Sequence, residues 1–353
     1  MSEFLHKVTG YMRRIDGTPA EPLRNGLLVL VGSIADLVYW IRRRGRDGIE
    51  HPLAELVSRQ VGEPRDRWDL TDLDALRAKS AGLMAYLPSR IRSTSYTERL
   101  GGVNGVDAIR LRPRKGASAP DAAVVYLHGG GFVLGDATSV LPEADVLSDR
   151  LRVDVYVIEY PLSPTSIYPE ALDRVAAGLR DLTDRHRRLV LVGESAGANV
   201  AVSAELRHPR LRENVVGLVL LYGWMDLRLT SNSIRRLGRG HVLTSAILHW
   251  FADQYTGGDQ ALRSNPEVTP LLHLELSELP PSLCIVGEFD PLIDDMVSVA
   301  KAIPNSELRV VRGMVHGFLQ FRTIYRQRLR VLSAVSAFIR RQLDDGDGNA
   351  IGK

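Results

Sequence analysis

Cysteine is almost absent from the sequence: Cys284 is the only one in 353 residues. A single cysteine cannot form an intramolecular disulfide, so nothing indicates an oxidising compartment. Cys284 lies in an apolar run at residues 283–286, where we expect a buried thiol rather than a nucleophile. Paired cysteines, the His-Glu-x-x-His pattern, the EF-hand loop and the phosphate-binding loop are also missing. We therefore expect neither a metal nor a cofactor.

Long hydrophobic runs are missing as well. A membrane-spanning helix needs about 20 apolar residues, and the nearest stretch, residues 26–41, is interrupted by Asp36. The first residues lack the basic start and apolar core of a signal peptide, so we expect a cytoplasmic protein. The net charge of +3 is small and spread along the chain, so we expect no nucleic-acid partner.

What is present divides the chain into parts. Residues 1–95 look mostly helical, and we expect them to form an N-terminal cap or extension. Residues 96–343 alternate apolar strands with helices, which predicts a mostly parallel sheet covered by helices on both faces. Inside this domain, residues 223–275 break the alternation as an insertion that contributes to the cap. Residues 344–353 are expected to be a flexible tail.

Two local features refine this division. Strands predicted at residues 94–99 and 106–112 join through Gly101-Gly102 and Asn104-Gly105, and Asn-Gly is typical of a hairpin turn. The insertion carries several aromatic residues, and these either line a pocket or pack a helical segment. They are Trp224, Trp250, Phe251 and Tyr255.

The most informative stretch is residues 188–202. An apolar run at 189–192 has the character of a buried strand, and GESAG at 193–197 leads from it into a helical segment. A strand that passes through Gly-x-Ser-x-Gly into a helix is typical of a nucleophile elbow. Gly193 and Gly197 leave room for neighbouring backbone, and the helix N-terminus suits developing negative charge. The pattern predicts that Ser195 is a nucleophile; an ordinary strand-to-helix turn is the alternative.

Three consecutive glycines follow the strand predicted at residues 122–127. The segment HGGGF at 128–132 leaves backbone N–H groups open to a ligand, which is typical of an oxyanion motif. A dinucleotide-binding fingerprint is an alternative, but Leu134 occupies the place of its third glycine. A flexible turn is another. We expect His128 and Gly129 to orient this turn.

A serine nucleophile needs a base, and the base needs an orienting acid. One late strand leads into Asp290, and the next leads into His316. Of the nine histidines, only His316 follows the last strand and is flanked by glycine. Asp226 is a rival acid, although it follows an earlier strand. Asp294 and Asp295 lie where a helix begins, and a favourable interaction with the helix dipole explains them.

Together these motifs resemble those of the hormone-sensitive-lipase-like carboxylesterases. They are HGGG at 128–131, YPLSP at 160–164, GESAG at 193–197, DPL at 290–292 and HGF at 316–318. The resemblance covers roughly residues 96–343. It implies an α/β-hydrolase fold with a helical cap and ester hydrolysis through a catalytic triad. The implied triad is Ser195, Asp290 and His316, and the implied oxyanion hole is formed by the N–H groups of Gly130, Gly131 and Ala196.

The sequence departs from the family pattern beside the site. YPLSP replaces the frequent YRLAP, and Glu194 replaces the common aspartate. These departures bear on the substrate more than on the chemistry. We expect a small-molecule ester, and a pocket that includes Phe132, Glu194, Trp224, Phe289 and Phe318.

Alternative functions remain open. An acyltransferase, a lactonase or an amide hydrolase could use the same triad, because water and other nucleophiles attack the same acyl-enzyme. A non-catalytic binding protein on this fold would be expected to lose Ser195 or His316, and both are present.

Residues 26–46 are the most unusual part of the N-terminal region. Nearly every residue from 27 to 41 is apolar, and a helix with so wide an apolar surface must bury it. Three hypotheses explain the burial: a structural cap helix, a lid that restricts which esters enter, or contact with a membrane surface or a second subunit. In the membrane hypothesis, the arginines at 42–46 lie near anionic headgroups. A homo-oligomer is therefore compatible with the sequence.

Overall fold

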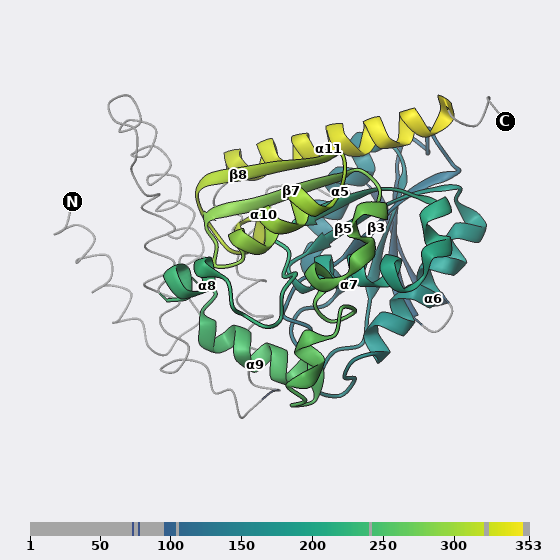
Figure 1. Cartoon of the computed structure of the whole chain (residues 1–353). Coiled ribbons are helices and arrows are strands. Elements are labelled where there is room, and N and C mark those ends of the chain that lie inside the picture. Colours follow the sequence, from purple (N-terminus) through teal and green to yellow (C-terminus); the bar gives the residue numbers. More distant parts are fainter. Residues whose placement is uncertain are drawn as a thin grey trace, which may run out of the picture.

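The computed structural model describes residues 73, 77, 95–103, 106–239, 242–320 and 325–348. These residues form one eight-stranded sheet in the order β1-β2-β4-β3-β5-β6-β7-β8 (Figure 1). The strands are β1 Ser95–Val103, β2 Val106–Pro113, β3 Ala122–Leu127, β4 Asp154–Glu159, β5 Arg188–Glu194, β6 Val215–Leu221, β7 Ser282–Phe289 and β8 Ser306–Val315. The helices are α5 Leu141–Leu151, α6 Glu170–Arg185, α7 Ala196–Arg207, α8 Asn232–Leu237, α9 Ser245–Thr256, α10 Ile293–Ala302 and α11 Tyr325–Gly348.

The sheet is mostly parallel, as predicted. From β4 through β3 to β8 every neighbouring pair runs parallel, whereas β2 pairs antiparallel with both β1 and β4. Strand β3, with the sequence AAVVYL, is buried at every position. A strand that is buried on both faces has no polar side to alternate with the apolar one. Its continuous apolar run is therefore explained by its central place.

The predicted pairing of the two strands is confirmed, with one correction, and the turn predicted at Asn104 and Gly105 lies outside the described residues. Strands β1 and β2 pair antiparallel, and Val103 lies opposite Val106. Gly101 and Gly102 do not form a turn; they lie inside β1, where the register shifts between Leu100 and Val103. Glycine tolerates the unusual backbone of such a bulge, so two glycines can mark a bulge as well as a turn.

Helices cover both faces of the sheet, which also agrees with the prediction. Helices α5 and α11 pack on each other, and α11 also packs on β5 and β6. Helix α7 packs on α6 and on β3, β5 and β6, while α10 packs on β7 and β8. Figure 1 shows α11 on one side of the sheet and α6 and α7 on the other.

Helix α11 is longer than predicted. It continues to Gly348, so residues 344–348, which were expected in the flexible tail, are helical. The apolar spacing ends at Leu343, and the prediction followed that spacing. Once a helix has formed, however, each further residue adds a backbone hydrogen bond without a new nucleation cost.

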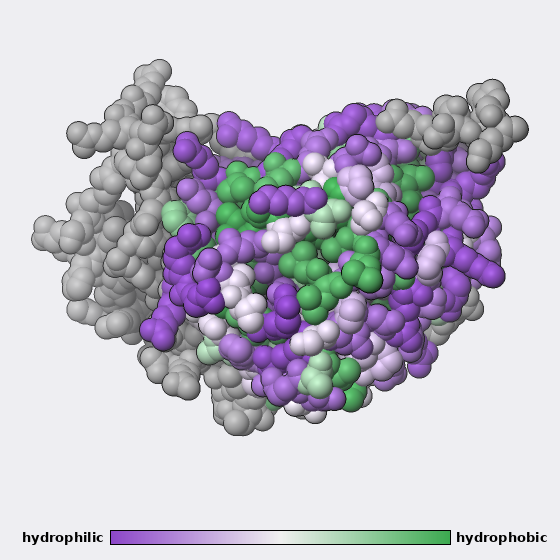
Figure 2. Space-filling model, in the orientation of Figure 1, coloured by the Kyte–Doolittle hydropathy of each residue, from purple (hydrophilic) through white to green (hydrophobic). Residues whose placement is uncertain are grey.

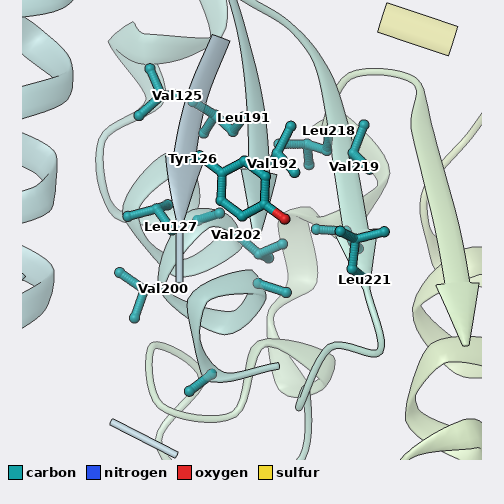
Figure 3. Close-up of a cluster of buried hydrophobic side chains, with 14 of the residues drawn as sticks. Val125, Tyr126, Leu127, Leu191, Val192, Val200, Val202, Leu218, Val219 and Leu221 are labelled. Carbon is teal, nitrogen blue, oxygen red and sulfur yellow. The ribbon is translucent and has the colours of Figure 1, made fainter. Parts of the chain in front are cut away.

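Tyr126 lies within the apolar core formed by β3, β5, β6 and α7 (Figure 3). The side chain is completely buried, with 0% exposure. A buried tyrosine hydroxyl needs a hydrogen-bond partner, and this one donates to Glu194 at the end of β5. The core is therefore linked directly to the residue before Ser195.

The segment between β6 and β7 is the predicted helical insertion. It contains α8 and α9, and the short 3-10 turns η4 Ala261–Ser264, η5 Pro270–Leu272 and η6 Leu274–Glu278. Figure 1 shows α8 and α9 at the lower left, outside the helices that cover the sheet. The insertion can therefore contact the loops at one end of the sheet.

Two helical residues of the N-terminal region are described. Leu73 packs against the core. Arg77 donates from Nε to the carbonyl of Val133 at 3.1 Å and from Nη2 to that of Ser163 at 3.0 Å. Part of this region thus contacts the loops that follow β3 and β4. The hypotheses for residues 26–46 lie outside the described residues.

The surface in Figure 2 is mostly polar, with apolar patches between the polar side chains. Five large hydrophobic side chains of the described residues are exposed: Tyr96, Ile167, Leu274, Leu308 and Val310. The last two lie on β8, which is an edge strand. No helix in the described part of the chain is both long and apolar enough to cross a membrane.

Candidate active site

Ser195 lies between the end of β5 and the start of α7. Its backbone has φ 53° and ψ −116°, which is strained for a residue other than glycine. A Cβ atom added at Gly193 would lie 2.5 Å from the Cα of Ala198, and one at Gly197 would lie 2.3 Å from the carbonyl oxygens of Leu127 and His128. Both positions therefore require glycine, as the elbow pattern predicts.

Neighbouring backbone holds the strained turn in place. The N–H of Ser195 donates to the carbonyl of Leu221 at 2.9 Å, and its own carbonyl accepts from the N–H of Trp224 at 3.1 Å. Backbone strain of this kind costs about 1–3 kcal/mol and persists only where the surroundings maintain it. The last residue of β6 and the segment that follows it provide that support.

Three of the predicted residues form one hydrogen-bonded row. His316 Nε2 lies 3.0 Å from Ser195 Oγ, and His316 Nδ1 lies 2.9 Å from Asp290 Oδ2 and 3.1 Å from Oδ1. Asp290 also accepts the N–H of Leu292 at 2.9 Å. Asp290 is completely buried, at 0% exposure, whereas His316 and Ser195 are 9% and 8% exposed. The row therefore begins inside the protein and ends at its accessible edge.

The turn at residues 128–132, which we call the glycine turn, lies against the elbow. A Cβ atom at Gly129 would lie 3.3 Å from that of Ser195. Gly130 and Gly131 have φ of 121° and 61°, and a Cβ at Gly130 would lie 1.9 Å from the carbonyl oxygen of Leu134. Among the described residues, the N–H groups of Gly130, Gly131 and Ala196 donate to no acceptor. Their role as an oxyanion hole stays a prediction.

His128, the first residue of the glycine turn, is buried. Its ring stacks on Tyr160 with a centroid distance of 4.3 Å, and Nδ1 lies 2.7 Å from the carbonyl oxygen of Gly129. A carbonyl only accepts, so Nδ1 carries the proton. Burial lowers the pKa of His128 to about 4, so the ring is neutral at neutral pH. The orienting role of His128 stays a prediction.

Glu194 links three parts of the site. Tyr126 of β3 donates its hydroxyl to Oε1, and Gln320 donates from Nε2 to Oε2 at 2.7 Å. Gln320 ends the 3-10 turn η7 Phe318–Gln320, which follows His316. Glu194 is only 2% exposed, and burial raises its pKa. We expected Glu194 to line the substrate pocket, but both of its oxygens are bonded inside the protein.

Sequence reasoning missed Tyr126 and Gln320. One signal existed for the first, because Tyr126 is the only side chain with a polar group in the buried run AAVVYL. No comparable signal marks Gln320. Its contact with Glu194 joins residues 126 positions apart in the chain, and local patterns carry no information about such a distance.

The rival acids have other partners. The carboxylate of Asp226 accepts from Arg228 Nε at 2.9 Å and Nη2 at 2.7 Å. Asp295 accepts the N–H groups of Met225 and Asp226, and burial raises its pKa well above the ordinary value. Asp294 accepts the N–H of Ser233 at 2.8 Å. Within the described residues, Asp290 alone among these acids is hydrogen-bonded to His316.

The aromatic residues expected in the pocket lie in two groups. Phe132 lies 5.6 Å from Trp224, measured between ring centroids, and both are buried. Phe318 packs edge-on against Tyr222, which packs in the same way against His316 at 5.2 Å. Phe289 is the half-buried last residue of β7. Their contact with a substrate stays a prediction.

No group of histidine, cysteine, aspartate or glutamate side chains among the described residues could hold a metal ion. Cys284 is buried, as expected, and burial raises its pKa to about 11, so the thiol is protonated at neutral pH.

Comparisons with known proteins agree with this fold. Residues 124–320 match the family model of the alpha/beta hydrolase fold. An ethyl acetate hydrolase of Pseudomonas putida is 30% identical over 256 residues, which cover 67% of this chain and 78% of that protein. The carboxylic ester hydrolase LipN of Mycobacterium tuberculosis is 30% identical over 267 residues, which cover 70% of each chain.

Solved structures extend the similarity. The crystal structure of an esterase from the bacterial hormone-sensitive lipase family matches with a TM-score of 0.74 at 25% identity, covering 84% of this chain and 99% of that one. EstE1, a thermophilic carboxylesterase cloned from a metagenomic library, matches with a TM-score of 0.70 at 26% identity, covering 77% of this chain and 98% of that one.

Proposed function

This chain belongs to the α/β-hydrolase family and is similar to the hormone-sensitive-lipase-like carboxylesterases, and we propose that it hydrolyses carboxylic esters through an acyl-enzyme on Ser195. One observation carries the proposal: His316 lies within hydrogen-bond distance of both Ser195 Oγ and the Asp290 carboxylate. A nucleophile, a base and an acid in such a row activate a serine hydroxyl at neutral pH. The esterase names of the relatives support the same bond type.

Acylation uses each member of the row once. His316 Nε2 takes the proton from Ser195 Oγ as the oxygen attacks the acyl carbon. The carbonyl oxygen becomes negative and accepts hydrogen bonds from the N–H groups of Gly130, Gly131 and Ala196. One donor of this kind contributes about 3 kcal/mol to transition-state stabilisation in comparable enzymes. The protonated imidazole then gives its proton to the alcohol oxygen, and the alcohol leaves.

Deacylation repeats these steps with water. His316 removes a proton from a water molecule, which attacks the acyl carbon. The proton returns to Ser195 Oγ as the carboxylic acid leaves. Throughout, Asp290 accepts the Nδ1–H bond, keeps the imidazole in the required tautomer and stabilises its charged form. The strained backbone of Ser195 places its hydroxyl at the tip of the elbow, within hydrogen-bond distance of His316.

The test is hydrolysis by the purified full chain. We would measure turnover of p-nitrophenyl esters of graded acyl length, and acid release from ethyl acetate at constant pH. Mass spectrometry after rapid quenching should find the acyl group on the peptide that contains Ser195. Ser195→Ala is the matched control, because it removes a single hydroxyl and keeps the Cβ atom, which changes little packing. Turnover that persists in this variant, or its absence with every ester in the wild type, would contradict the proposal.

A further inference from the structure

Two aromatic rings of helix α9 lie against the glycine turn. Phe251 and Tyr255 are four positions apart, so they project from the same side of the helix. We propose that they are positioning residues for the oxyanion hole, and that the insertion therefore serves catalysis as well as covering the site. The inference rests on the proposed esterase function.

Phe251 occupies the space in front of Gly131. A Cβ atom added at Gly131 would lie 2.4 Å from both Cγ and Cδ2 of the Phe251 ring. Real Cβ atoms do not approach other atoms so closely, so the ring already touches the glycine backbone. Phe251 is 7% exposed, and close packing around it leaves the ring little room to retreat. The contact limits movement of Gly131 toward α9.

Tyr255 holds the next residue of the turn. Its ring stacks on Phe132 with a centroid distance of 3.9 Å and an interplanar angle of 10°. Phe132 has φ 66°, which is unusual for a bulky residue and needs support from its surroundings. Its carbonyl also accepts the N–H of Ser163 at 2.8 Å. The stack and this bond together maintain the strained conformation.

The two contacts act on consecutive residues from one rigid element. Gly131 belongs to the proposed oxyanion hole, and Phe132 is the residue that follows it in the chain. A displacement of about 1 Å in an active site can cost about 100-fold in rate. The spacing of Phe251 and Tyr255 on α9 therefore controls where the N–H of Gly131 lies when negative charge develops.

The first experiment compares Phe251→Ala and Tyr255→Ala with the wild type. We expect kcat to fall about 10- to 100-fold in each, with KM changed much less, because the oxyanion contact is made mainly in the transition state. Affinity for a trifluoromethyl ketone, which adds to Ser195 as a charged hemiketal, should fall in parallel with kcat/KM. Tyr255→Phe keeps the stacked ring, and its hydroxyl has no partner among the described residues, so it should retain activity.

A control separates positioning from general destabilisation. Ile339→Ala removes a completely buried side chain from α11, on the far side of the sheet from α7. It should lower the melting temperature as Phe251→Ala does, but leave kcat and the ketone affinity of the folded enzyme unchanged. Equal kinetic losses in this control and in Phe251→Ala would mean that Phe251 is merely structural, and would overturn the proposal.

A double-mutant cycle tests the contact itself. Gly131→Ala should lose at least about 100-fold in kcat, because its methyl group meets the Phe251 ring. Adding Phe251→Ala should recover part of that loss, since only the backbone strain at φ 61° then remains. If the wild type hydrolyses esters but no recovery occurs and Phe251→Ala keeps the wild-type kcat, this inference is wrong while the proposed function stands. An inert wild type would overturn the proposed function and, with it, this inference.

Discussion

Asp290 and Glu205 are both completely buried carboxyl groups, at 0% exposure, yet their surroundings differ. Asp290 accepts hydrogen bonds from the His316 ring and from the N–H of Leu292. Glu205, near the end of α7, has no partner for either oxygen among the described residues. Burial raises the pKa of Glu205 to about 8, although Arg212 opposes the shift. Glu205 is therefore mostly protonated at neutral pH.

The comparison shows that burial does not by itself make a carboxylate functional. A buried charge is costly unless hydrogen bonds and opposite charge replace the lost water. Asp290 has donors from two directions, and one of them is the imidazole that becomes cationic during catalysis. Glu194 is intermediate, because its two oxygens accept from Tyr126 and Gln320 but from no cation. The donors of each carboxyl group, more than its depth, distinguish the three.

Removing the charge from Asp290 should have the largest effect. Asp290→Asn replaces one carboxylate oxygen by a donating NH₂ group. The remaining oxygen accepts the N–H of Leu292, so the NH₂ group faces His316 Nδ1 and favours the other imidazole tautomer. We expect kcat to fall by about 10⁴-fold, the size of the same change in a comparable Ser-His-Asp triad. Steady-state kinetics would measure the loss, and circular dichroism would check the fold. A loss below tenfold would remove Asp290 from the triad.

The intermediate case is Glu194. Glu194→Gln keeps the shape but places an NH₂ group against one of the two donors, and an unsatisfied buried group costs about 1–3 kcal/mol. We expect kcat to fall about tenfold, because one of the two bonds that connect the elbow to β3 and to the turn after His316 is lost. Gln320→Leu, which removes one donor, is the matched comparison. Wild-type activity in both variants would show that this link does not position the triad.

Replacing Asp226 should lower activity much less than replacing Asp290 in the same assay. Its carboxylate bonds to Arg228, which is 37% exposed, and partly exposed pairs contribute little. For Asp226→Asn we expect kcat to stay within about twofold of the wild type. The comparison reverses if this variant loses as much activity as Asp290→Asn, since Asp226 would then be the catalytic acid.

Glu205 should affect stability and leave activity unchanged. The pKa of Glu205 in the folded protein, about 8, lies above the ordinary value of 4.5, so the folded state binds the proton more tightly than the unfolded state does. The stabilisation of the folded state by this proton is complete below about pH 4.5 and is lost as the pH rises through 8. The glutamine in Glu205→Gln cannot ionise, so this variant does not lose stability as the pH rises. We expect it to exceed the wild type in unfolding free energy by on the order of 3 kcal/mol near pH 9, and to match it near pH 5. Urea unfolding at both pH values measures the difference; parallel pH dependences would show that Glu205 is not the titrating group.

Much of the candidate site could be predicted because its signals are local. Glycines at 193 and 197 are needed wherever a serine lies at so tight a turn, whatever the rest of the chain does. The choice of Asp290 over Asp226 used strand order, and carboxyl ends of parallel strands meet at one edge of a sheet. Gly101 and Gly102 show the limit of this approach, since a bulge and a turn use the same residue type.

The amino-acid sequence alone was sufficient for the sheet, the strand-to-helix turn at Ser195, the glycine turn and the choice of the three side chains that form one hydrogen-bonded row, because each depends on neighbouring residues or on chain order. Only the tertiary structure could show that Tyr126 and Gln320 meet on Glu194, across 68 and 126 positions of sequence. The same holds for the rings of α9 against Gly131 and Phe132. These contacts depend on how helices and loops pack in three dimensions, and a pattern read along the chain contains no measure of that packing.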